Sequence, residues 1–198
     1  EIPSPPVLPE LPDLVVASTD SLEVAGYRKS LGPDAQKCWT EMTFARSRAV
    51  VGLEDLPTEQ TQRVLDWTPD RGHLLLVGSP RSGRTTALRT IATTLSATTS
   101  PSDLHLYVFD FGGSLRPLQA LPHVGAVVGT SEPDRLRRLV KRLSSEMSRR
   151  VAEFQRFGAG SLAEYKAGSG NHLAEILVLI DRWEVIAERD PEEAARLR

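Results

Sequence analysis

The sequence predicts an α/β fold built on a mostly parallel sheet, and three observations support this prediction. Short apolar runs of the kind found in buried strands recur at residues 73–77, 104–109 and 176–180. Segments with helical periodicity lie between these runs, at residues 85–95 and 131–157. A glycine-rich turn joins the first run to the first helical segment. Strands that helices cover on both faces lack polar alternation, so this succession indicates βαβ units.

The region ahead of the first apolar run divides into an extension and the start of a domain. Residues 1–42 are expected to form a proline-rich linker and N-terminal extension. Five of the 14 prolines fall within residues 1–12, where they favour an extended chain. The domain itself is expected to cover residues 43–198. Its first segments, residues 43–53 and 63–67, are predicted to be short strands that frame a polar stretch.

The most regular helical pattern covers residues 131–157. Apolar side chains recur there at steps of three and four residues, namely Leu136, Val140, Leu143, Met147, Val151 and Phe154. Ser131 with Asp134 resembles a capping box at the start, and Gly158 stands where a left-handed cap is expected. The shorter predicted elements are helices at residues 115–120 and 191–197 and an apolar segment at residues 125–129.

Composition excludes several classes of protein. With 198 residues, 40% of them hydrophobic, the chain is long enough to bury a core without disulfides or a structural metal. Its apolar runs are far shorter than the ~20 residues of a membrane-spanning helix, and no signal peptide is expected. The net charge of −2 gives no support for general nucleic-acid binding. A single cysteine, Cys38, fits a reducing compartment such as the cytoplasm.

The glycine-rich turn has the spacing of a phosphate-binding loop. Its residues follow the pattern G-x-x-x-x-G-[K]-[ST], with arginine at the lysine position. Glycines let successive backbone amides point inward, and the following helix adds its own amides and positive dipole end. A threonine hydroxyl at the end of the pattern can hold Mg²⁺. The predicted nucleotide-binding residues are Gly78, Ser79, Pro80, Arg81, Ser82, Gly83, Arg84, Thr85 and Thr86.

Arg84 is the departure from this pattern. Lysine supplies a compact charge that reaches the β- and γ-phosphate oxygens, whereas a guanidinium is broader and planar. The positive charge is kept, so we expect nucleotide to bind with weaker or misaligned contact to the γ-phosphate. The alternative is a glycine-rich turn that binds no nucleotide.

Two aspartates that follow apolar runs, Asp110 and Asp181, are candidates for the metal side of this site. We select Asp181, because its run is the more hydrophobic and stands further along the chain from the loop. Thr85 and Asp181 are therefore the predicted metal ligands; the alternative is that Asp181 only caps its strand. Arg182 follows where a hydrolase has glutamate. Hydrolysis is thus expected to be slow or absent, and no catalytic residue is assigned.

Several short segments together resemble the FtsK/SpoIIIE family of motors, and most of all the ATPase domains of EccC in type VII (ESX) secretion. The segments are VGLED at 51–55 with Gln60 and Gln62, GHLLLVG at 72–78, YVFDFGG at 107–113, LPHVG at 121–125 and the arginine-rich residues 135–150. The resemblance implies a RecA-like P-loop fold, ATP with Mg²⁺, and several such domains in tandem. Arg84 and Arg182 then indicate a degenerate domain with a docking or regulatory role.

The resemblance also implies partners and a location. The expected partners are neighbouring ATPase domains and the signal peptide of a secreted, small helical-hairpin substrate. The expected location is cytoplasmic, within a membrane-associated secretion complex. In RecA-like sheets the strand between the loop strand and the Asp181 strand comes later in the chain. Few residues follow Asp181, so we expect this sequence to be the N-terminal part of a longer domain.

Two other functions stay open at this point. A DNA translocase motor is conceivable because residues 135–156 are rich in arginine, although such a helix face is more often solvated or paired. A nucleotide-free interaction module is the other alternative.

Overall fold

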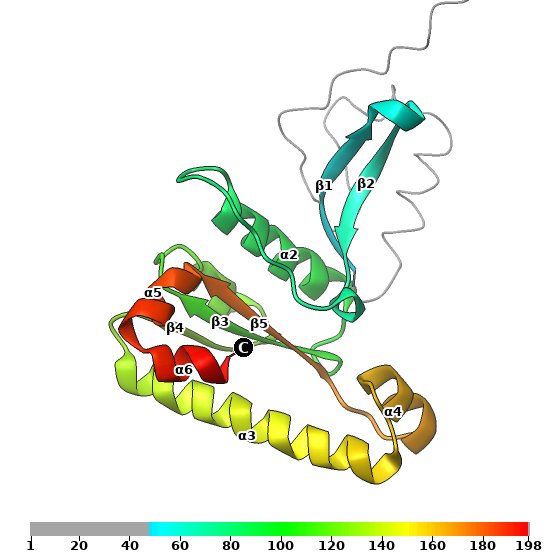
Figure 1. Ribbon diagram of the computed structural model, residues 1–198, viewed down its shortest axis with the longest axis vertical. Coiled ribbons are helices and arrows are strands. Elements are labelled where there is room, and N and C mark those ends of the chain that lie inside the picture. The colour runs from blue at the N-terminus through cyan, green and yellow to red at the C-terminus, as the bar shows by residue number, and fades with distance from the viewer. Residues whose placement is uncertain (1–47, 198) are drawn as a thin grey trace, which may run out of the picture. The chain divides into compact units, whose positions relative to one another are not determined.

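The computed structural model describes residues 48–197, which belong to two compact units that divide after Thr99 (Figure 1). The predicted linker at residues 1–42 lies outside the described residues. None of the helices within residues 48–197 combines the length and the apolar character needed to cross a membrane.

The first unit contains a β-hairpin and a helix. Strands β1 (Ala49–Leu56) and β2 (Thr61–Trp67) pair antiparallel, and the short 3-10 turn η1 (Pro57–Glu59) connects them. Both strands run further into the polar stretch than the sequence predicted. Glu54 and Arg63 face each other across the ladder and form an ion pair of 2.8 Å, which makes polar residues compatible with the strands there.

Helix α2 (Arg84–Thr98) follows the hairpin after the 3-10 turn η2 (Pro69–Arg71), and it confirms the helix predicted at residues 85–95. It buries one face, formed by Ile91, Ala92 and Leu95, and it packs against β1. Its first residue comes directly after the glycine-rich turn, as the phosphate-loop pattern requires.

The strand predicted at residues 73–77 is the main error of the sequence analysis. These residues form no regular element, and Leu75 and Val77 are 78% and 84% exposed. An apolar segment becomes a buried strand only where other strands pair with it and other elements cover both its faces. Within residues 48–197 no strand pairs with this segment, so its hydrophobic side chains stay in solvent.

The second unit is built on a parallel sheet of three strands, which confirms the predicted fold class. Its order is β4 (Val124–Gly129), β3 (Leu104–Asp110), β5 (Glu175–Asp181). Leu104, Leu106, Val108 and Phe109 of β3 are all fully buried. In β5 most of the apolar side chains are only half-buried, because within the described residues this strand pairs on one side alone.

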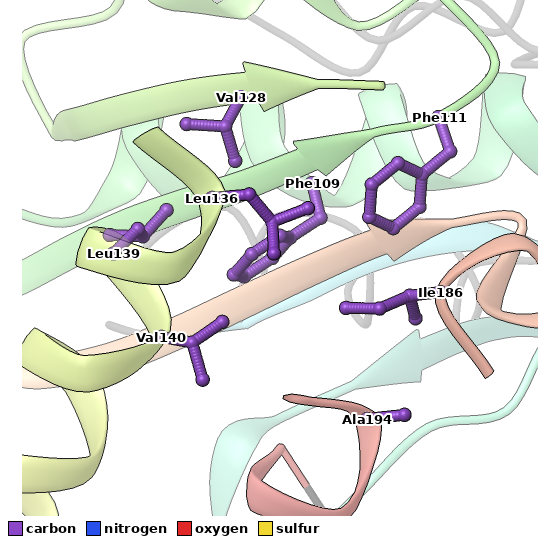
Figure 2. Close-up of a cluster of buried hydrophobic side chains, with 8 residues drawn as sticks. All are labelled: Phe109, Phe111, Val128, Leu136, Leu139, Val140, Ile186 and Ala194. Atoms are coloured by element: carbon purple, nitrogen blue, oxygen red, sulfur yellow. The ribbon is translucent and has the colours of Figure 1, made fainter. Parts of the chain in front are cut away.

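One face of this sheet carries the core. Helices α3 (Pro133–Phe157), α5 (Trp183–Arg189) and α6 (Pro191–Arg196) place their apolar side chains against it (Figure 2). The cluster consists of Phe109, Phe111, Val128, Leu136, Leu139, Val140, Ile186 and Ala194. The 3-10 turn η3 (Arg116–Ala120) connects β3 to β4, where a short helix was predicted.

The long helix α3 is confirmed, but only its first half is packed as its apolar stripe predicted. Leu136 and Val140 are buried, whereas Met147 is 64% exposed and Val151 is also exposed. Near the C-terminal end of α3, Phe154 contacts Tyr165 of helix α4 (Leu162–Ser169). The stripe therefore continues in the sequence beyond the part of the sheet that covers it.

Of the two caps predicted for α3, the C-terminal one is confirmed and the N-terminal one is wrong. Gly158 has φ of 67° and forms the predicted left-handed cap. The predicted capping box at Ser131 is wrong, since the helix begins after Glu132 and no side chain caps it. The Glu132 carboxylate instead pairs with Arg135 and Arg116 and accepts a hydrogen bond from the Gly129 amide. The hydrogen bond from Arg135, with the other two partners, holds the pKa of Glu132 below its usual value.

Candidate nucleotide-binding site

The phosphate loop, defined here as residues 78–86, turns sharply into α2. The Ser82 amide donates to the Ser79 carbonyl at 3.2 Å, which closes a turn. Gly83 has φ of 90° and is the last residue before the helix. Only glycine adopts this conformation without strain, so the position of the second glycine of the motif is explained by the backbone.

The first glycine of the motif lies close to another residue of the loop, and a larger side chain there would have to displace it. A Cβ atom at Gly78 would lie 2.3 Å from Oγ of Ser82. The loop therefore folds back over its own start, as a loop that surrounds a phosphate group must do.

The first turn of α2 supplies the remaining features of an anion site. The Ala87 amide donates to the Gly83 carbonyl at 2.8 Å and makes the first helical hydrogen bond. Residues 84–86 precede it, so the helix itself provides no acceptors for their amides. Arg84 and Thr85 are half-buried in this turn, and Thr86 is exposed. A helix start of this kind attracts phosphate.

Asp110 and Asp181 stand side by side at the carboxyl ends of β3 and β5, where the ladder pairs them directly. They are 4% and 5% exposed. The Asp110 carboxylate accepts hydrogen bonds from the amides of Ser114 and Leu115, at 3.0 and 2.9 Å. Asp110 therefore fixes the loop that follows its own strand, and the selection of Asp181 as the metal aspartate stays a prediction.

Asp181 lies against the backbone of Gly112. A Cβ atom at Gly112 would be 2.2 Å from Oδ2 of Asp181, so no larger residue fits there without movement of the carboxylate. In the sequence, the glycine pair at 112–113 was noted only as part of the segment at 107–113 that carries the family resemblance. The contact depends on the pairing of β3 with β5, which a linear pattern does not reveal.

The charged residues that follow Asp181 most closely are Arg182 and Glu184. Arg182 has φ of 60° and is exposed at the start of α5, and Glu184 is exposed in its first turn. Within residues 48–197 no group of three or more His, Cys, Asp or Glu side chains is placed to hold a metal ion. Thr85 belongs to the first unit and Asp181 to the second, so a shared metal site stays a prediction.

The comparison with known proteins decides the family. The model of the FtsK/SpoIIIE family matches residues 39–197, which is most of the chain. The chain belongs to the FtsK/SpoIIIE family. This result confirms the resemblance that the short segments indicated, and it places the phosphate loop of this FtsK/SpoIIIE chain in a family of P-loop ATPases.

Two of the relatives of this FtsK/SpoIIIE chain are the secretion proteins EccC and EssC. It is 35% identical over 147 residues to the ESX secretion system protein EccC of Thermomonospora curvata. This alignment covers 70% of this chain and 11% of EccC. It is 30% identical over 185 residues to the type VII secretion system protein EssC of Staphylococcus aureus, and this alignment covers 92% of this chain and 12% of EssC. The chain thus spans about an eighth or less of the length of these relatives.

A solved structure of Thermomonospora curvata EccC, containing ATPases 2 and 3 in complex with a signal sequence peptide, has a similar fold. Its TM-score is 0.69 at 31% identity, over 77% of this chain and 29% of that one. The α/β fold of this FtsK/SpoIIIE chain is therefore that of an EccC ATPase domain.

Proposed function

We propose that this chain is a degenerate ATP-binding domain of a type VII secretion motor protein. It binds ATP or ADP weakly with Mg²⁺ through residues 78–86, and it hydrolyses ATP slowly or not at all. The observation that carries the proposal is the tightly folded phosphate loop, with Arg84 as the first residue of α2.

Binding is supported by the shape of the loop and by the charge beside it. The close approach of Gly78 to Ser82, the left-handed Gly83 and the start of α2 together provide the curled backbone that a phosphate group needs. Arg84 keeps a positive charge there, but its forked head does not reach the γ-phosphate as a lysine ammonium does. Thr85 and Asp181 are the residues that would hold Mg²⁺, which screens the phosphate charges when bound.

Slow hydrolysis is supported by Arg182. A hydrolase at this place needs a carboxylate that orients and deprotonates the attacking water. Arg182 is a cation with its side chain exposed, and it offers no acceptor for a proton.

The nucleotide proposal is tested with Arg84→Lys. A fluorescent ATP analogue is titrated into the full chain with and without Mg²⁺. We expect Arg84→Lys to tighten binding by about tenfold, since about 1.4 kcal/mol of γ-phosphate contact is regained. Arg89→Lys is the matched control, because Arg89 is exposed on α2 beyond the first turn, and its affinity should equal that of the wild type.

Two results would contradict this part of the proposal. One is tight binding with rapid turnover by the unaltered chain, which would mean an intact motor. The other is a melting temperature that millimolar ATP leaves unchanged in both the wild type and Arg84→Lys, which would select the nucleotide-free interaction module.

We further propose a docking or regulatory role in the export of small helical-hairpin substrates. The partners would be the signal peptide of a secreted protein and neighbouring ATPase domains, on the cytoplasmic side of a membrane-associated complex. The support is that EccC from Thermomonospora curvata has been solved with a signal sequence peptide and with two ATPase domains. Binding of a secreted partner's C-terminal segment to this chain, measured by calorimetry, tests this role.

A DNA translocase is the second candidate, and the exposed cations of α3 favour it. Arg138, Lys141 and Arg156 are exposed, and none of them has an ion pair within residues 48–197. However, Arg135, Arg137, Arg149 and Arg150 are held by acidic side chains of the same protein. Salt-sensitive duplex binding with DNA-stimulated ATP hydrolysis would support the translocase, and no response to DNA would reject it.

A further inference from the structure

A pocket of about 630 Å³ lies in the second unit at the amino ends of β3 and β5, where the middle of α3 passes over the sheet. His105 lines it from β3, while His172 and Ile176 line it from the chain that enters β5. Asp110 and Asp181 stand at the opposite, carboxyl ends of the same strands. This amino-end pocket is therefore distinct from the predicted metal aspartate, and the inference below does not depend on nucleotide binding.

The charged lining of the amino-end pocket comes mainly from α3, which contributes Arg142, Arg149, Arg150 and Glu146. Glu146 accepts hydrogen bonds from Arg149 and from Arg150, both at 2.7 Å. The hydrogen bonds from Arg149, with those from Arg150, lower the pKa of Glu146 to about 2. Glu146 is thus paired with Arg149 and Arg150, and within residues 48–197 it forms no ion pair with the third arginine.

Arg142 is that third arginine, and it is an available cation. It is exposed at the rim of the pocket, and within residues 48–197 no acidic side chain pairs with it. His105 faces the same pocket from an exposed position on β3. A concave surface with an excess of positive charge attracts anions more strongly than a flat one does.

The rest of the lining indicates which kind of anion fits. Apolar side chains stand between the cations, from Leu143 on α3 and from Leu173 and Ile176 near β5. The residues from α3 lie in the middle of the helix, whose amides are engaged in its own hydrogen bonds. The α3 part of the lining therefore offers neither curled amides nor a helix start, and its donors are guanidiniums, which pair with carboxylates or phosphates in a planar fork. The apolar side chains between the cations favour a peptide that carries carboxylates.

We propose that the amino-end pocket binds an acidic peptide segment that alternates carboxylate and apolar side chains. A carboxylate pairs with Arg142, and the neighbouring apolar side chains contact Leu143 and Ile176. The volume lies within the range of ligand sites, which is roughly 300–1,000 Å³, and it is large enough for a short stretch of peptide.

The test uses a short fluorescein-labelled peptide that alternates glutamate with leucine, and a second peptide with glutamine in place of glutamate. Anisotropy is measured with the full chain at low and at high salt. We expect the glutamate peptide to bind more tightly than the glutamine peptide, and added salt to reduce that difference. Arg142→Glu should weaken binding of the glutamate peptide by about tenfold or more.

The matched control is Arg156→Glu, which makes the same change of charge. Arg156 is also exposed on α3 without an ion pair within the described residues, but it lies outside the pocket. Its effect on affinity should stay within about twofold. The ring resonances of His105 and His172 should shift when the glutamate peptide is added to the wild type.

Four outcomes would overturn the proposal. Equal affinity for the two peptides would show that carboxylates are not recognised. Equal losses from Arg142→Glu and Arg156→Glu would show attraction to the whole helix and not to the pocket. Histidine resonances that do not move would place the peptide elsewhere. Displacement of the peptide by duplex DNA at a lower concentration than by unlabelled glutamate peptide would assign the surface to nucleic acid.

Discussion

At the scale of single residues, Gly112 is the position where the fold leaves least freedom. Its backbone supports the carboxylate of Asp181, and the space for a side chain is already occupied by Oδ2 of that residue. A residue noted in the sequence only as part of the segment at 107–113 thereby limits where the carboxylate of the predicted metal aspartate can lie.

Gly112→Ala should lower the free energy of unfolding by about 1–3 kcal/mol, because the added methyl group forces a buried carboxylate to move. Chemical denaturation measures this change. Gly168→Ala is the control, since nothing lies within 4 Å of a Cβ atom there and the residue is within α4. That variant should gain about 0.5–1 kcal/mol from helix propensity. Equal effects of the two substitutions would contradict the contact between Gly112 and Asp181.

Glu146 gives a prediction for pH dependence at the same scale. Its pKa is lowered to about 2 by the hydrogen bonds from Arg149, with Arg150 adding to them, so the folded state favours the charged form. The resulting stability is fully present above the ordinary carboxyl pKa of 4.5 and is lost as the pH falls toward 2.

Glu146→Gln should therefore destabilise the protein at neutral pH, by on the order of 1 kcal/mol after allowance for solvent screening. The difference from the wild type should shrink as the pH falls from 4.5 toward 2. Glu188→Gln, at an exposed position on α5 without an ion pair among the described residues, should change little. A difference between wild type and Glu146→Gln that stays constant over this pH range would contradict the account.

At the scale of elements, β5 is one of the two edge strands of the parallel sheet as the described residues form it. The Glu175 amide donates to the Asp103 carbonyl at 2.8 Å, so the amides of alternate residues, Leu177 and Leu179, also face β3. The amides of Ile176, Val178 and Ile180 face the other side, where no strand pairs within residues 48–197.

Hydrogen exchange followed by NMR should show this alternation directly. The amides of Ile176, Val178 and Ile180 should exchange faster than those of Leu177 and Leu179, since only the second group is hydrogen-bonded to β3. Uniform protection along β5 would mean that another strand occupies its free side, either from a second copy or from elsewhere in the chain.

The elements also show what the sequence could predict. The sequence predicted strands β3, β4 and β5 and helix α3. These predictions succeeded because the apolar residues of each element lie on the side that neighbouring elements cover. Residues 73–77 have an equally apolar run but no partner strand within residues 48–197, so their composition alone was misleading. The cap at Ser131 failed because the helix begins one residue later than predicted, with Glu132 as the N-cap residue and Pro133 as its first residue.

At the scale of the whole molecule, the family assignment and the local geometry support the same proposed function. The FtsK/SpoIIIE match rests on the sequence as a whole, whereas the loop geometry rests on Gly78, Gly83 and the start of α2. The motif residues of the loop could be predicted from their spacing in the sequence. The amino-end pocket could not be predicted in this way, because its lining comes from three segments that lie far apart in the sequence.

The central claim is that residues 78–86 hold the phosphates of a nucleotide. The most direct measurement is an NMR titration of the isotope-labelled full chain with ATP and Mg²⁺, with the backbone amides of this loop assigned. We predict that the amides of Gly83, Arg84 and Thr85 shift at millimolar ATP and return when ATP is removed. Amides in the loop that do not move, while shifts occur elsewhere or nowhere, would contradict the account.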